Sequence, residues 1–185
     1  MSKKKPSGWT QIRHQLNDCS KPDLIALLKD LCEASSDNLD FIQARLQVED
    51  GSGEALEKYR RKIVEQFFPL YGFGKLKLGE ARKTIRDYRK ASGNLAGTID
   101  LMLTYVEKGT EFTRQFGDIN ESFYNSLESV FDEMAQLLLH EGVDFYHRFQ
   151  ERIQHLTTHA KFIGWGYGDF LDEQVDILEQ KLAGE

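Results

Sequence analysis

The stretch ESFYNSLESVFDEMAQLLLHEG, residues 121–142, is the longest run of helical periodicity in this chain. Its apolar side chains recur at steps of three and four residues, the spacing of one helix face. They are Phe123, Leu127, Val130, Phe131, Met134, Leu137 and Leu138. No proline interrupts the run, and Gly142 follows it. The pattern predicts an amphipathic helix that buries one face in a core.

The segments on either side have the same period. Residues 20–34 open with Ser20, Pro22 and Asp23, an acidic variant of a capping box, and continue with leucines on one helical face. Further helices are predicted within 35–46, with the cap at Asp37 or Ser36, and at 56–68, 78–91, 95–109, 143–162 and 169–183, with a short turn over 110–120. No segment alternates apolar and polar residues between turns, so no sheet is predicted.

Short helices joined by tight connections become antiparallel neighbours. The sequence therefore predicts an all-α fold, a single compact or gently superhelical stack of about eight to ten antiparallel helices. The chain has 185 residues, of which 40% are hydrophobic, which is enough for one core. We expect a flexible basic tail over residues 1–8 and a single all-α domain over 9–185.

Composition narrows the class of protein. A net charge of −6 argues against general attraction to nucleic acid or to anionic membranes. No apolar run approaches the roughly 20 residues that cross a bilayer, and the start MSKKKPSGW precedes a polar segment, unlike a secretory signal. Cys19 and Cys32 form no CxxC motif. We expect a cytoplasmic protein with reduced thiols, no membrane contact and no cofactor.

Four stretches carry a resemblance to a known family. In chain order they are KPDLIALLKDLCEASSDNLDFIQARL, EQFFP…GFGKLKLGEARKTIRDYRK, LMLTYVEKGTEFTRQFGDINESFYNSLESVFDEM and FIGWGYGDFLDE, of which GFGK, EFTRQFGDINESFYNS and GWG are the most specific parts. The chain resembles a bacterial family of uncharacterised helical proteins, classed as a domain of unknown function, over about residues 11–178. The resemblance implies one helical, bacterial, cytoplasmic domain. It implies no activity, so no functional residue is carried over from it.

The segment GWGYG has the composition of a binding loop. Its glycines, Gly164, Gly166 and Gly168, do not match G-x-G-x-x-G, and no strand precedes them as a dinucleotide loop requires. The structural interpretation is that glycine supplies unusual backbone angles while Trp165 and Tyr167 bury their rings and lock the bend. On this interpretation, replacing Trp165 by alanine destabilises the fold.

Residues 58–90 form a basic segment with eleven basic and three acidic side chains. Arg82, Arg86 and Arg89 share one helical stripe, and guanidinium groups suit phosphate or carboxylate. The candidate polyanion-binding residues are Lys75, Lys77, Arg82, Arg86 and Arg89. The alternative is that these arginines pair with acidic helices of the same chain or face water. The neighbouring YGFGK, residues 71–75, lacks the P-loop pattern.

A row of possible metal ligands follows at steps of four residues: His147, Glu151, His155 and His159. The spacing H-x-x-x-H can chelate a metal on a helix, but a zincin needs glutamate directly after the first histidine, and Leu156 stands there. A helical wheel of 143–162 places His147, Glu151 and His155 roughly opposite the apolar stripe. We therefore interpret the row as a solvated face and expect no native metal site.

No catalytic motif stands out. Asp118, Glu121, Asp132 and Glu133 begin or cover helices, as capping predicts, and no nucleophile elbow is present. Whether the chain is an enzyme stays open. The favoured hypothesis is a non-catalytic interaction protein whose grooves and loop rims bind another protein. The alternative is nucleic-acid or phosphate-ligand binding through 58–90, with Trp165 or Tyr167 as a stacking platform. A metal-dependent hydrolase is third, and the oligomeric state is left open.

Overall fold

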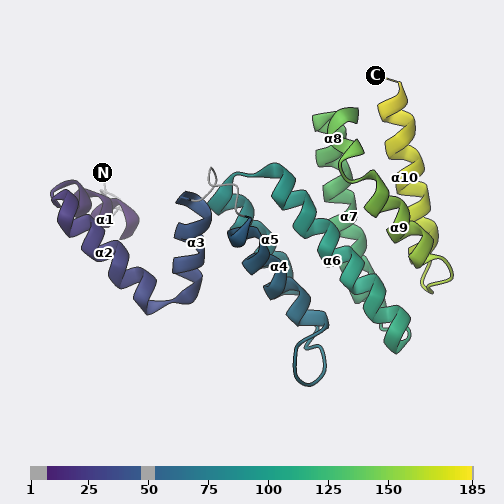
Figure 1. The fold of residues 1–185 in the computed structure, drawn as a ribbon, viewed down its shortest axis with the longest axis horizontal. Helices are drawn as coiled ribbons and strands as arrows, with labels where there is room; N and C mark the ends of the chain where they lie inside the picture. Colours follow the sequence, from purple (N-terminus) through teal and green to yellow (C-terminus); the bar gives the residue numbers. More distant parts are fainter. Residues whose placement is uncertain (1–7, 47–52, 185) are drawn as a thin grey trace, which may run out of the picture. The chain divides into compact units, whose positions relative to one another are not determined.

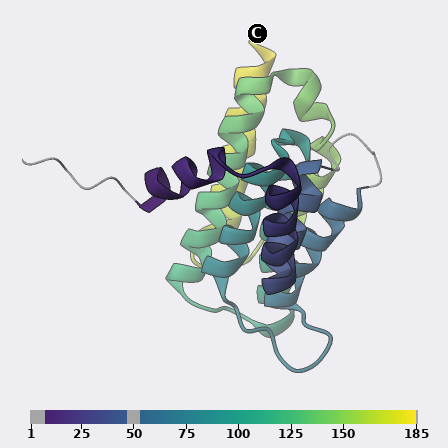
Figure 2. The same cartoon turned by 90° about the vertical axis from the view of Figure 1, so that its left-hand side faces the viewer.

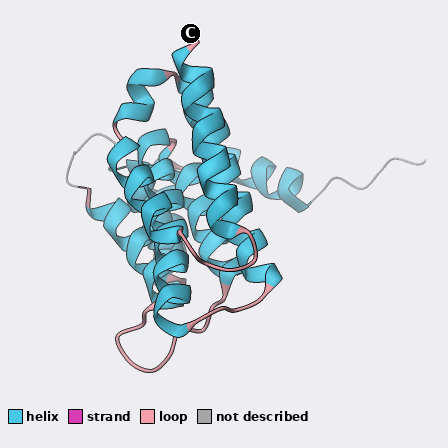
Figure 3. Ribbon diagram, turned by 90° about the vertical axis from the view of Figure 1, so that its right-hand side faces the viewer, coloured by secondary structure: helices cyan, strands magenta, loops and turns pink. Residues whose placement is uncertain are grey.

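The computed structural model describes residues 8–46 and 53–184. These residues form ten α-helices and no strand, as Figures 1 and 3 show, so the predicted all-α stack is confirmed. The chain divides into two units, Met1–Gln43 (unit 1) and Ala44–Glu185 (unit 2). The single domain over 9–185 stays a prediction.

Unit 1 contains α1 (Gly8–Asn17), α2 (Lys21–Ala34) and most of α3 (Ser36–Leu46). The predicted capping box begins α2: Ser20 Oγ accepts from the Asp23 backbone N–H at 3.4 Å, and the Asp23 carboxylate accepts from the Ser20 N–H at 3.2 Å. None of the described residues of this unit is buried. Residues 1–7 of the predicted basic tail lie outside the described residues, and Gly8 begins α1.

Unit 2 contains the remaining helices. They are α4 (Glu54–Phe67), α5 (Leu78–Ser92), α6 (Leu95–Phe116), α7 (Glu121–Glu141), α8 (Val143–His147), α9 (Gln150–Ala160) and α10 (Tyr167–Ala183). The central helix is α6, which contacts α4, α5, α7 and α9. None of the helices in the described residues combines the length and the apolar character that a membrane crossing needs.

The predicted helix at 121–142 is α7, and its buried face supplies much of the core. Six of its seven predicted apolar positions are buried, and Leu137 is half-buried. The Asn120 side chain caps the helix by accepting from the Phe123 N–H at 3.0 Å. The periodic spacing therefore identified the core-facing side of this helix correctly.

Two predicted boundaries are wrong. The turn expected over 110–120 is helical as far as Phe116, because Thr110, Phe112 and Thr113 are buried and extend the inner face of α6. The helix expected over 143–162 breaks after His147 and resumes at Gln150. The break lets α8 pack on α7 while α9 packs on α6, which one straight helix would not do.

Candidate functional site

Three connections lie at the same end of unit 2, because successive helices alternate in direction (Figure 1). They are residues 68–77, 117–120 and 161–166. The Phe68 and Phe116 ring centroids lie 6.4 Å apart, and Trp165 stacks on Tyr124 with centroids 6.5 Å apart. A Cβ atom at Gly164 would lie 2.7 Å from a carboxylate oxygen of Asp118. The three connections therefore form one continuous end.

This end gathers most of the large exposed apolar side chains of unit 2. We call the following set the aromatic end: Leu70, Tyr71, Phe73, Phe116, Phe162 and Trp165. The first three are 85–92% exposed, and Phe162 is fully exposed. Only Leu46 and Val143 join them among the described residues of unit 2. So large an exposed apolar set at one place is unusual for a surface that contacts only water.

The 68–77 connection extends beyond the helices that it joins (Figures 1 and 2). Its base, where the connection joins α4 and α5, is nevertheless fixed, because the Leu76 N–H donates to the Gln66 carbonyl at 3.0 Å. Gly74 lies so close to the Phe67 carbonyl that a Cβ atom would overlap it, and Gly72 has a left-handed φ of 79°. The glycines of YGFGK therefore serve a tight bend that presents three apolar side chains.

The prediction for the GWGYG segment holds for Tyr167. This side chain is buried, its hydroxyl lies 2.7 Å from the Thr110 hydroxyl, and burial raises its pKa. Gly168 is equally constrained, since a Cβ atom there would lie 2.7 Å from the carbonyl oxygen of Ala160. These contacts join the start of α10 to α6 and to the end of α9.

The same prediction is wrong for Trp165, which is 59% exposed. Trp165 and Gly166 both have left-handed φ values, 62° and 73°, and this bend turns the indole outward. The indole contacts the Tyr124 ring at an interplanar angle of 28°. The large loss of stability expected for a buried tryptophan therefore does not apply to Trp165→Ala.

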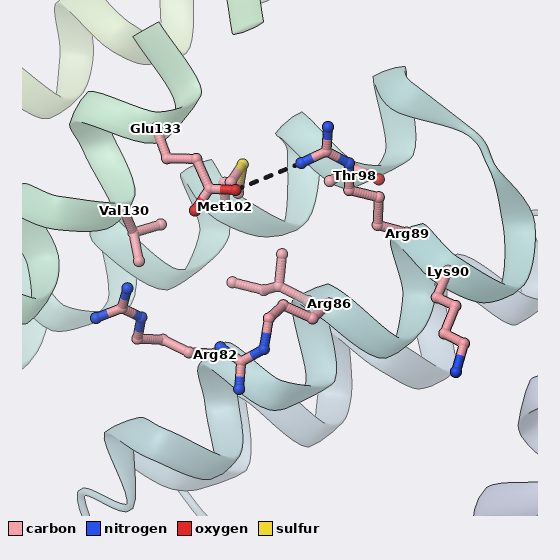
Figure 4. A pocket seen from close by; sticks show the side chains of 9 residues that line it. Arg82, Arg86, Arg89, Lys90, Thr98, Met102, Val130 and Glu133 are labelled. Atoms are coloured by element: carbon pink, nitrogen blue, oxygen red, sulfur yellow. Dashed lines mark hydrogen bonds and ion pairs between the residues drawn. The ribbon is translucent and has the colours of Figure 1, made fainter. Parts of the chain in front are cut away.

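A second candidate site is a cavity of about 230 Å³ between α5, α6 and α7 (Figure 4). Its lining residues are Arg82, Ile85, Arg86, Arg89, Lys90, Thr98, Met102, Val130 and Glu133. We call it the arginine cavity. Arg82 Nη2 donates to Ser129 Oγ at 3.2 Å, and Arg89 Nη1 lies 3.4 Å from Glu133 Oε1.

Three of the five predicted polyanion-binding residues line the arginine cavity. It gathers Arg82, Arg86 and Arg89, whereas Lys75 and Lys77 are exposed and lie outside its lining, at the 68–77 connection. Lys90 also lines the cavity but is absent from the predicted set, although its spacing of four residues from Arg86 was a usable signal. Of the three arginines, only Arg89 has an ion pair with an acidic side chain of the described residues.

The predicted histidine row is interrupted. His147 ends α8, so it is not in register with Glu151, His155 and His159 on α9. His155 and His159 have ring centroids 3.8 Å apart and line a cavity of about 420 Å³ with Glu107 and Glu111. No group of three or more His, Cys, Asp or Glu side chains in the described residues is arranged to hold a metal ion.

Comparison with known proteins gives no relative for this chain: no family model, no curated protein and no solved structure matches it. The geometry defines an all-α protein whose unit 2 is a set of antiparallel helices. That unit has two features from which a function can be argued, the aromatic end and the arginine cavity.

Proposed function

We propose that this chain is a non-catalytic interaction protein that binds another protein through its aromatic end. The observation that supports this function is the joint exposure of Leu70, Tyr71 and Phe73 on a connection with a fixed base. Each such side chain keeps apolar surface in water at about 25 cal/mol per Å². A partner that covers these side chains removes that cost, which favours association.

The residue types and shape of the aromatic end also suit protein recognition. Tyrosine and tryptophan are enriched among the few residues that dominate binding energy, and such anchors fill pockets of the partner. Because hydrogen bonding and close contact fix the base of the 68–77 connection, binding orders few additional backbone angles. We infer that the connection enters a concave apolar pocket of the partner.

Charge at the aromatic end suggests the rim of that pocket. The 68–77 connection carries Lys75 and Lys77, both exposed, and no acidic residue. Lys161, at the start of the 161–166 connection, is also exposed. Complementary charge at an interface rim mainly increases the association rate and specificity. We therefore expect acidic residues at the edge of the pocket where it surrounds the 68–77 connection; the exposed Asp118 of the 117–120 connection lies at the same end of unit 2.

The experiment compares proteins captured from host-cell extract by the full chain, by the triple variant Leu70→Ser/Tyr71→Ser/Phe73→Ser, and by the control Leu46→Ser. Leu46 is also exposed in unit 2, and its neighbour Arg45 donates to the Lys90 carbonyl, at the end of α5 opposite the 68–77 connection. A partner purified after capture is expected to bind the triple variant at least about thirtyfold more weakly than the parent, since one anchor contributes roughly 2 kcal/mol or more. The control is expected to bind like the parent.

A second measurement tests the aromatic end directly. The chain has two tryptophans, so Trp9→Phe leaves Trp165 as the only one. Adding the purified partner is expected to shift Trp165 fluorescence to shorter wavelength, because the exposed indole loses water. Equal binding by parent and triple variant would contradict the proposal. So would association with lipid vesicles in place of a protein.

A further inference from the structure

We propose that the arginine cavity is a binding site for a small organic phosphate, a ligand with one phosphate monoester attached to a compact apolar group. This site is separate from the aromatic end and would operate with or without a protein partner. The class of ligand follows from the charge, the existing contacts and the size of the cavity.

The excess positive charge of the lining side chains favours a ligand that carries more than one negative charge. Three arginines and one carboxylate line the cavity, an excess of two positive charges without Lys90 at the rim, in a chain of net charge −6. Arg82, Arg86 and Arg89 come from one face of α5 and line the same cavity, so an anion bound there reduces their mutual repulsion. A phosphate monoester carries roughly −1.5 to −2 charges and three acceptor oxygens, so it matches this excess better than a carboxylate does.

The existing contacts leave donors available. Arg86 and Lys90 have no acidic partner among the described residues, and Arg82 uses one nitrogen on a neutral hydroxyl. The Arg89–Glu133 pair is long, at 3.4 Å, and both side chains are about half exposed. Exposed pairs contribute little stability, so a phosphate can replace Glu133 at small cost. Figure 4 shows Arg82 and Arg86 extending to the same side, whereas Lys90 points away at the rim.

The apolar lining residues and the volume of the cavity restrict the chemistry and the size of the rest of the ligand. Ile85, Met102 and Val130 are buried side chains that line the cavity from three different helices. An apolar group of the ligand would contact them and displace water, which strengthens the nearby charge interactions. The volume of about 230 Å³ holds a small molecule. A nucleic acid strand would need its phosphate contacts spread along a surface, whereas Arg82, Arg86 and Arg89 all line one cavity of limited volume.

The test is calorimetric titration of the full chain with phenyl phosphate at low salt. One site per chain is expected, with Arg86→Gln weakening affinity about tenfold, since a charge-assisted hydrogen bond is lost. Arg61→Gln is the matched control: it makes the same change in the same basic segment, on an exposed residue outside the cavity. Its affinity is expected to stay within about twofold of the parent.

Glu133→Gln is expected to change the affinity for phenyl phosphate in the opposite direction. Removing this carboxylate frees Arg89 and removes repulsion, so affinity is expected to rise by about threefold or more. Three outcomes would overturn the proposal: no binding of phenyl phosphate at millimolar concentration, equal weakening by Arg86→Gln and Arg61→Gln, or weaker binding in Glu133→Gln. Tighter binding of a single-stranded oligonucleotide than of phenyl phosphate, insensitive to which arginine is changed, would also overturn it.

Discussion

Two glycines in equivalent helix positions have opposite surroundings. Gly168 is the second residue of α10 and faces the Ala160 carbonyl oxygen, whereas Gly79 is the second residue of α5 and faces open space. Neither has a left-handed φ. Helix propensity is therefore similar at the two positions, and only the contact with α9 distinguishes them. Adding a single methyl group by a glycine-to-alanine substitution therefore shows whether packing requires the glycine.

We predict that Gly168→Ala lowers the free energy of unfolding by about 1–3 kcal/mol, because the contact is with backbone that cannot move aside easily. Gly79→Ala is the control and is expected to be neutral or stabilising by up to about 1 kcal/mol. Urea denaturation of both variants measures the difference. Equal stabilities would show that the end of α9 shifts to accommodate the methyl group.

At the scale of elements, a charged cluster joins three helices. Arg152 of α9 donates to Asp100 at 2.5 Å and to Glu107 at 2.6 Å, both on α6, and Arg60 of α4 donates to Asp100 at 2.6 Å. The Asp100 side chain is only 18% exposed. Burial alone would lower the pKa of Arg152, but the Glu107 and Asp100 carboxylates hold it above its ordinary value. The cluster therefore fixes how α4 and α9 lie on α6.

We predict that Asp100→Asn lowers the free energy of unfolding by about 1–3 kcal/mol, because two half-buried guanidinium groups lose their shared carboxylate. The control is Asp87→Asn, which breaks only the exposed pair with Lys83 on α5. This control is expected to change the free energy by less than about 0.5 kcal/mol. Guanidinium-induced unfolding measures the free energy of unfolding of both variants. Equal values for Asp100→Asn and Asp87→Asn would contradict the prediction.

At the scale of the whole molecule, unit 2 holds five tyrosines whose pKa values are raised above 10.0, chiefly by burial. They are Tyr88, Tyr105, Tyr124, Tyr146 and Tyr167. Their phenols ionise near pH 10 when the chain unfolds but keep their protons in the folded state. The resulting stability is complete below about pH 10 and is lost as pH rises through the raised values.

We therefore predict a steep fall of melting temperature above about pH 10, together with a late rise of tyrosinate absorbance. Tyr167→Phe is expected to make the fall less steep, because it removes one buried ionisable phenol. The control is Tyr71→Phe, which changes an exposed tyrosine on the 68–77 connection. If both variants have the parent's pH dependence, the buried phenols do not control alkaline unfolding.

The sequence alone determined most of the helices and, for α7, the direction of the buried face. It did not predict α1, and the leucine face predicted for α2 is not buried. The Ser20–Asp23 capping box and the apolar spacing of 121–142 are local patterns, so their physics is complete within a few turns of chain. The arginine stripe could also be predicted, because Arg82, Arg86 and Arg89 lie on one helix. Lys90 was available from the same spacing.

Only the tertiary structure decided which side chains those helices expose or bring together. Trp165 and Tyr167 are two residues apart with similar chemistry, yet one is exposed and the other lies against Thr110 of α6. The aromatic end unites connections about ninety residues apart, and the Arg152 cluster joins three helices. These arrangements depend on which helices pack together, and periodicity does not encode that choice because it describes one helix at a time.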